Sequence, residues 1–241
     1  MTELILSDIT RMGPGFCIIG LEAIPRGYRS IRPLPRFSHA WPPTLRHRRG
    51  WRVQCELSTI PVAAPHVEDR FSTGVLKKVG EVPEEDLVRC LLQAEVAEHV
   101  RDLFGCLLQE NRTGRGFSAE PREAARSICG VELQNIRFVV AKERENEIRA
   151  ELLFRDGARL ELPLVDSVWR EFIETALTQM TRANKEQRVH RFLHSWLPAR
   201  MLAHAKLFAR IGLTRPFMEK CWLMLDSLFP QPQAEWNAGI E

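Results

Sequence analysis

The alternating segment IRAELLFRDGARLELPLV, residues 148–165, constrains the fold of this chain more than any other stretch. Apolar and charged residues alternate on both sides of Asp156-Gly157. A period of two is the pattern of a half-buried strand, and Asp-Gly between two such runs is typical of a type I′ turn, whose two central residues have positive φ. The segment therefore predicts a β-hairpin within an antiparallel sheet.

Further strands are expected towards both ends of the chain. The first sixty residues hold four short apolar or alternating runs separated by Pro and Gly, which is typical of a small barrel. Near the C-terminus, two runs separated by a short loop predict a second hairpin. The strands expected besides the first hairpin are residues 4–9, 16–24, 28–35, 51–60, 136–143, 205–213 and 221–229.

Helices are expected where the apolar period lengthens. From residue 84 to 109 apolar residues recur every three or four positions, which predicts an amphipathic helix of about seven turns. A short helix is expected around residues 121–129, with Pro121 in its first turn. Residues 168–180 predict a third helix, with Asp166 as its N-cap. The order of elements is that of an α+β fold without regular βαβ alternation.

Composition excludes several classes of protein. The chain has 241 residues, of which 44% are hydrophobic and 27% charged, as in an ordinary globular protein. No apolar run reaches the roughly 18 residues of a membrane helix, and the N-terminus does not have the pattern of a signal peptide. The six cysteines form no CxxC pair, and no Gly-rich phosphate loop is present. We expect a cytoplasmic protein with reduced thiols and no cofactor.

Five segments, in their order along the chain, resemble a prokaryotic family named for its dual OB-fold domain. They are LILSDITRMGPGFCIIGLE, SIRPLP, APHVEDR, RLELPLVDSVWRE and RIGLTRPFMEKCWLML, and they span about residues 4–230. The resemblance implies an α+β protein with two OB-like small β-barrel units, a long intervening helix and additional helices. The expected divisions are residues 1–83 for the first OB-like unit, 84–130 for the helical connection, 131–232 for the second unit with its inserted helix, and 233–241 for a loose tail.

Residues 26–52 are the most basic stretch of the chain, with eight arginines, two histidines and no Asp or Glu. Arg suits phosphate and stacks on bases, and aromatic residues lie between the arginines. A solvated loop is the simpler explanation of this stretch, whereas a GC-rich genome would raise Arg along the whole chain and explains the local excess less well. Trp51 fits a core position better than an exposed one. The residues expected to contact nucleic acid, most of them on one positive face of the first unit, are Arg29, Arg32, Trp41, Arg46, Arg48, Arg49, Trp51, Arg52 and Arg215.

Two other motifs offer titratable side chains. PHVED brings His66, Glu68 and Asp69 within four residues, and an enzyme centred on this motif is a third reading of the chain. Metal sites usually gather ligands from several elements, however, so packing or capping is the better interpretation. His190 and His194 would share a helix face, but the sequence offers no third ligand beside them. We expect no catalytic set and no metal site.

The function predicted from these features is non-enzymatic. OB-folds bind single strands in grooves that combine positive charge with stacking aromatic side chains. Family members are thought to sense or bind nucleic acid in prokaryotic defence systems, so the resemblance implies a sensor or accessory subunit that binds nucleic acid, single-stranded in the first place. The alternative is a scaffold or regulatory subunit that docks an acidic protein partner through its basic face. Neither role involves a membrane.

Overall fold

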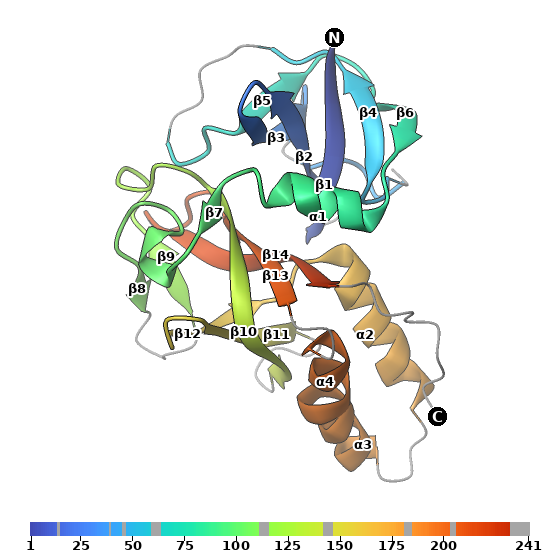
Figure 1. The fold of residues 1–241 in the computed structure, drawn as a ribbon, viewed down its shortest axis with the longest axis vertical. Helices are drawn as coiled ribbons and strands as arrows, with labels where there is room; N and C mark the ends of the chain where they lie inside the picture. Colours follow the sequence, from blue (N-terminus) through green and yellow to red (C-terminus); the bar gives the residue numbers. More distant parts are fainter. Residues whose placement is uncertain are drawn as a thin grey trace.

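The computed structural model describes residues 1–13, 15–38, 40–44, 47–58, 64–110, 116–141, 147–180, 185–202 and 206–231. It has the predicted mixed α+β class and is rich in strands. Two strand-rich units follow one another along the long axis; α3 (Lys185–Arg191) and α4 (Leu197–Leu202) lie at the end away from the first unit, and α2 (Ser167–Gln179) runs towards that end from beside the first unit (Figure 1). The predicted contact Arg46 and the predicted tail at 233–241 lie outside the described residues.

The first unit is one curled sheet. Its strands are β1 (Thr2–Met12), β2 (Gly15–Ile24), β3 (Gly27–Pro35), β4 (Trp51–Cys55), β5 (Asp69–Ser72) and β6 (Lys77–Glu81). They lie in the order β5-β3-β2-β1-β4-β6, with β3 and β5 parallel and the other pairs antiparallel. A bridge between Leu57, just after β4, and Ser72 brings the two sides together. The sheet therefore closes into a half-barrel, and β6 extends it as an exposed edge.

The core of this unit explains which strands were predictable. Alternate residues of β1 to β4 point inwards and form a buried apolar cluster, which includes Leu4, Leu6, Ile18, Ile31 and Val53. The four strands predicted in the first sixty residues are confirmed. The sequence predicts only a connection where β5 and β6 lie, because neither strand has an alternating apolar pattern.

The predicted long helix over residues 84–109 is wrong. Only α1 (Glu84–Leu91) is helical, and it buries Leu87, Val88 and Leu91. The chain then turns, because backbone groups bond to distant strands instead of the next helical turn. Gln93 O accepts from Tyr28 N at 3.2 Å, and Glu95 O accepts from Gly130 N at 2.7 Å. Tertiary pairing here overrides helix propensity.

The described rest of the connection consists mostly of turns and bends with a few short strands. It contains β7 (Val96–Ala97), the short 3₁₀ turn η1 (Val100–Asp102), β8 (Gln109–Glu110) and β9 (Phe117–Ala119). The short helix predicted around residues 121–129 is not formed: residues 121–123 make turns, and Ile128 begins the next long strand.

The second unit repeats the connectivity of the first. Its strands are β10 (Ile128–Ala141), β11 (Glu147–Phe154), β12 (Arg159–Pro163), β13 (Lys206–Leu213) and β14 (Cys221–Gln231). The sheet order is β12-β11-β10-β13-β14-β9-β8, and a parallel bridge from Leu164 to Leu225 joins the end of β12 to β14. In both units the first strand pairs with the second and fourth, and the third runs parallel to the fifth. Both predicted hairpins are confirmed.

The turn of the first hairpin differs from the prediction. Its loop has three residues, because Phe154 N donates to Ala158 O and Gly157 N donates to Phe154 O, both at 3.0 Å. Only Gly157 has a positive φ, of +82°. This is the pattern of a three-residue loop with glycine in the left-handed position, and not of a type I′ turn.

Three helices and a π-helical turn are inserted between β12 and β13. They are α2 (Ser167–Gln179), α3 (Lys185–Arg191), the turn η2 (Phe192–Trp196) and α4 (Leu197–Leu202). The predicted helix at 168–180 and its N-cap are confirmed, since Asp166 Oδ1 accepts from Val168 N at 2.9 Å and from Trp169 N at 3.3 Å. The inner side of α2 packs on the core of the second sheet.

The two units share a buried interface. Leu21 of β2 and the apolar face of α1 pack with Phe208 of β13 and Phe229 of β14 in one hydrophobic cluster. The outer face of β1 to β3 is therefore covered by the second unit. This burial decides which of the predicted site residues remain at the surface.

Candidate nucleic-acid interface

Arg32, predicted as a phosphate contact, lies inside the protein. It is 6% exposed, and its Nη1 lies 2.9 Å from Asp69 Oδ1 and 3.0 Å from His66 Nδ1. Its Nη2 donates to Ser127 Oγ at 3.2 Å. The alternation of β3 puts this side chain on the face that the second unit covers, so its expected place on a positive surface is wrong.

The PHVED motif supplies most of the partners in this buried network. Glu68 accepts from the backbone N–H of Ser127 at 2.9 Å and from its hydroxyl at 2.8 Å. Asp69 also forms an ion pair with Arg215, which is 31% exposed. Burial, with Arg32 and Arg215 nearby, lowers the pKa of His66 to about 3, so its imidazole is neutral. These are the contacts of a packing network that joins the two units.

Arg49 is also withdrawn from the surface. Its side chain is 10% exposed and forms an ion pair with Asp166, the N-cap of α2. It donates to Leu228 O at 3.2 Å and to Ser227 Oγ at 3.3 Å, and its guanidinium lies 4.9 Å from the centre of the Phe229 ring. Arg49 therefore joins the first unit to α2 and β14, which corrects its expected exposure.

The other predicted residues are divided between core and surface. Trp41 is 7% exposed, and its Nε1 donates to Pro33 O at 2.8 Å, so it is a core residue. Arg29 and Arg52 are exposed, but they pair with Glu22 at 2.5 Å and with Glu3 at 2.7 Å. The described arginines of residues 26–52 therefore do not form the single positive face that was expected.

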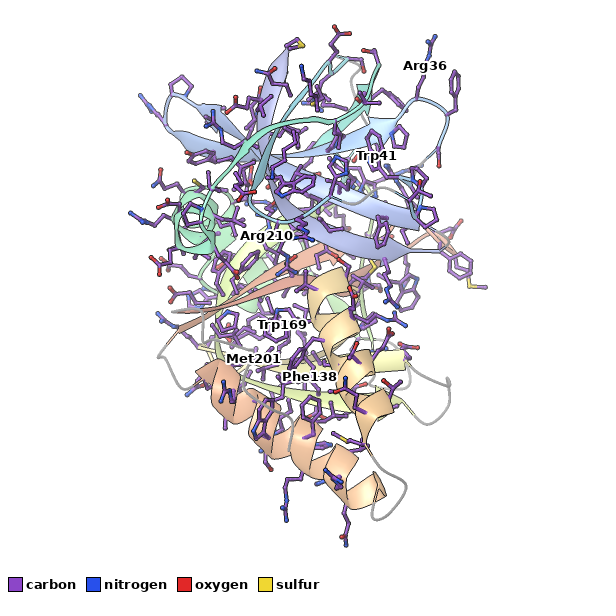
Figure 2. The ribbon with its side chains drawn as sticks, turned by 90° about the vertical axis from the view of Figure 1, so that its right-hand side faces the viewer. Arg36, Trp41, Phe138, Trp169, Met201 and Arg210 are labelled. Carbon is purple, nitrogen blue, oxygen red and sulfur yellow. The ribbon has the colours of Figure 1, made fainter. Side chains whose placement is uncertain are left out.

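A second buried charge cluster was not predicted. Arg210 of β13 is fully buried and lies where the two units meet (Figure 2). Its Nη2 donates to Ser30 Oγ at 2.9 Å, and its Nε lies 3.5 Å from Asp8 Oδ2. Asp226 lies nearby, and burial together with the charge of Asp8 raises its pKa to about 8. A charged residue inside an apolar strand was the only sequence signal for this cluster.

The surface of the first unit nevertheless keeps an excess of positive charge. Burial removes Asp8, Glu68 and Asp69 from it, whereas among its described bases it removes only Arg32 and Arg49. Four acidic side chains remain at least partly exposed: Glu3, Glu22, Glu56 and Glu81. Nine described basic side chains remain at least partly exposed: Arg11, Arg26, Arg29, Arg36, Arg48, Arg52, Arg70, Lys77 and Lys78.

Part of this charge surrounds an aromatic ring on the strand pair β4–β6. Lys78 Nζ lies 4.3 Å from the centre of the half-buried Trp51 ring and also pairs with Glu81 at 2.6 Å, and the His47 ring lies 5.7 Å from the Trp51 ring. We name this surface the edge patch: His47, Arg48, Trp51, Arg52, Lys77 and Lys78. The strand register places Lys77 and Lys78 opposite Gln54 and Val53. Of the predicted contacts, Arg48, Trp51 and Arg52 therefore lie on this strand pair or just before it, and Arg52 also pairs with Glu3.

Within the described residues, no helix is long and apolar enough to cross a membrane. Nor do three His, Cys, Asp or Glu side chains in that part of the chain come together as metal ligands. No protein-family model, no curated protein and no solved structure matches this chain.

Proposed function

We propose that the protein binds single-stranded nucleic acid through the edge patch and performs no chemistry on it. The observation that carries this proposal is that Lys78 lies over the partly exposed ring of Trp51, with the exposed Arg48 and Lys77 close to these two residues in the chain. Single strands are bound by positive surfaces that follow the backbone, with aromatic rings on which bases stack. A role in a prokaryotic defence system stays a prediction, because it follows from the resemblance alone.

The connectivity of both units supports an OB-like interpretation of the fold. An OB-fold is a five-stranded, partly open Greek-key barrel that binds oligonucleotides. Five strands of each unit, β1–β5 and β10–β14, share one pairing order. The third strand is parallel to the fifth in the first unit, and in the second unit a parallel bridge joins the end of the third strand to the fifth. The proposed function uses this architecture as a rigid support for the patch.

The bound strand would follow the β4–β6 edge and not the outer face of β1 to β3. Ile19, Leu21 and Ser30 on that face are at most 3% exposed, because the second unit covers them. The strand β6, in contrast, is exposed along most of its length. Lysines on an edge strand can also serve to prevent edge-to-edge pairing with another chain. The salt dependence of binding distinguishes phosphate contacts from this protective role.

The test is fluorescence anisotropy of a labelled mixed-sequence single strand at several salt concentrations. Phosphate contacts release counterions, and for single strands each contact contributes about 0.7 to the slope of log K against log salt. We expect the triple variant Arg48→Ala, Lys77→Ala, Lys78→Ala to bind more weakly, with a slope reduced by about 2. The matched control replaces three exposed arginines outside the first unit, Arg101, Arg159 and Arg191, by Ala.

Three outcomes are informative. A reduced slope for the triple variant together with an unchanged slope for the control supports the proposal. Binding that is lost equally in both variants indicates a general charge effect and contradicts the assignment to the edge patch. If the wild type shows no salt-sensitive binding to DNA or RNA strands, the proposal fails, and docking of an acidic protein partner on the same basic side chains becomes the better account.

A further inference from the structure

The turn between β13 and β14 presents two large apolar side chains to solvent. Phe217 is 64% exposed and Met218 is 79% exposed. Phe217 and Lys220 exchange backbone N–H to O hydrogen bonds of 2.8 and 3.2 Å, so the loop consists of Met218 and Glu219 alone. Their φ angles are +51° and +65°, which is the pattern of a type I′ turn.

The residues of this turn are an unfavourable choice for its backbone. Type I′ turns favour Asn-Gly or Asp-Gly, because a side chain with a Cβ resists positive φ. Met218 and Glu219 are the only non-glycine residues with positive φ in the described part of the chain. Strained backbone of this kind is concentrated at functional sites. The exposure and the strain therefore point to the same two-residue tip.

The tip is braced from three sides. Thr214 N donates to Trp222 O, and Trp222 N donates to Thr214 Oγ1, both at 2.9 Å. Arg215 forms an ion pair with the buried Asp69 of the first unit. On the other strand, Lys220 Nζ donates to Gln109 Oε1 at 2.7 Å. A tip held in this way loses little conformational entropy when it binds a ligand.

The charges beside the tip indicate what kind of ligand it fits. Arg215 and Lys220 flank the apolar pair, Arg70 follows Asp69 in the chain and is partly exposed, and Glu219 is the single acid of residues 214–220. Flat apolar groups next to negative charge are what unpaired bases on a phosphate backbone offer. Phe and Met are among the side chains that proteins insert between bases.

We propose that Phe217 and Met218 form a wedge that stacks against the bases of a bound single strand. This inference rests on the proposed function and extends it. The edge patch on the first unit holds phosphates, and the wedge on the second unit holds bases. Stacking by apolar side chains tolerates any sequence, because every base has a π face.

The experiment uses a series of single strands that carry 2-aminopurine at successive positions. The fluorescence of this base changes when its stacking changes. We expect a change at one position, or at adjacent positions, on saturation with the wild type. In the variant Phe217→Ser, Met218→Ser the change should disappear and the affinity should fall at least fivefold, since a lost stacking contact weakens binding by this much or more. The salt slope should stay the same, because no phosphate contact is lost.

The control is Glu219→Gln at the neighbouring turn position. It removes a like charge near the phosphates and leaves the wedge, so it should keep the fluorescence change and bind more tightly at low salt. The double Ser variant should melt at the wild-type temperature, because both side chains are exposed.

Wild-type binding without a fluorescence change at any position overturns the wedge and leaves the proposed function standing. Unchanged affinity of the double Ser variant overturns it as well. If no strand binds in a salt-sensitive way, both proposals fail together.

Discussion

Asp226 is a buried carboxyl group close to the interface between the two units. Burial and the nearby Asp8 raise its pKa to about 8, from an ordinary value of 3.8, although Arg32 and Arg210 act in the opposite direction. The folded state therefore holds a proton that the unfolded state releases from about pH 4 upwards. Stability should fall as pH rises between these values and then level off above about 8. We predict that Asp226→Asn is more stable than the wild type at pH 8, by more than about 1 kcal/mol, the equivalent of roughly one pKa unit.

The measurement is urea unfolding of both proteins between pH 5 and 8.5. His66 acts in the opposite sense below pH 6.5, because its lowered pKa makes the folded state bind fewer protons there. The difference between variant and wild type removes this contribution, since both proteins contain His66. A difference that does not grow with pH would show that Asp226 is ionised in the folded protein at neutral pH.

The first hairpin gives the sharpest prediction at the scale of single elements. Gly157 has a φ of +82°, and no atom lies within 4 Å of the position that a Cβ would take. A side chain there would thus be strained by the backbone and not by crowding. Gly157→Val should lower the free energy of unfolding by about 1 to 3 kcal/mol. The control Gly74→Val is at a site that is equally open but lacks positive φ, so equal losses in the two variants would contradict the explanation.

Elements whose pattern reflects their own burial could be predicted from the sequence. The alternation in β11 and β12, and the apolar face and Asp166 cap of α2, are local, and each predicted the observed element. The end of the helix at Leu91 could not be predicted from the local sequence, because the carbonyl groups of Gln93 and Glu95 bond to strands far away in the chain. The burial of Arg32, Arg49 and Arg210 could not be predicted from the sequence for the same reason. Their partners Asp69, Asp166 and Asp8 come from distant segments, so an arginine on the surface and one in an interface look alike in sequence.

At the scale of the whole molecule, the two units should behave as one cooperative body. They share an apolar cluster around Leu21 and Phe229, and buried ion pairs cross between them. The adjacent residues Arg48 and Arg49 separate function from stability within this body. One is exposed in the edge patch, and the other is buried against Asp166. Replacement by Ala should therefore reduce stability at position 49 and nucleic-acid binding at position 48.

We predict that Arg49→Ala lowers the stability of the whole protein by about 3 kcal/mol, because it leaves the buried carboxylate of Asp166 without its cation. Thermal unfolding should still be a single transition, shifted to lower temperature. Arg48→Ala should change stability by less than about 0.5 kcal/mol, as exposed substitutions usually do, and should weaken nucleic-acid binding with a smaller salt slope. Adding Asp166→Asn to Arg49→Ala should restore part of the lost stability, because the unpaired charge is removed. Calorimetry decides the matter: two separate transitions in Arg49→Ala, or equal losses of stability in the two single variants, would show that Arg49 does not couple the units.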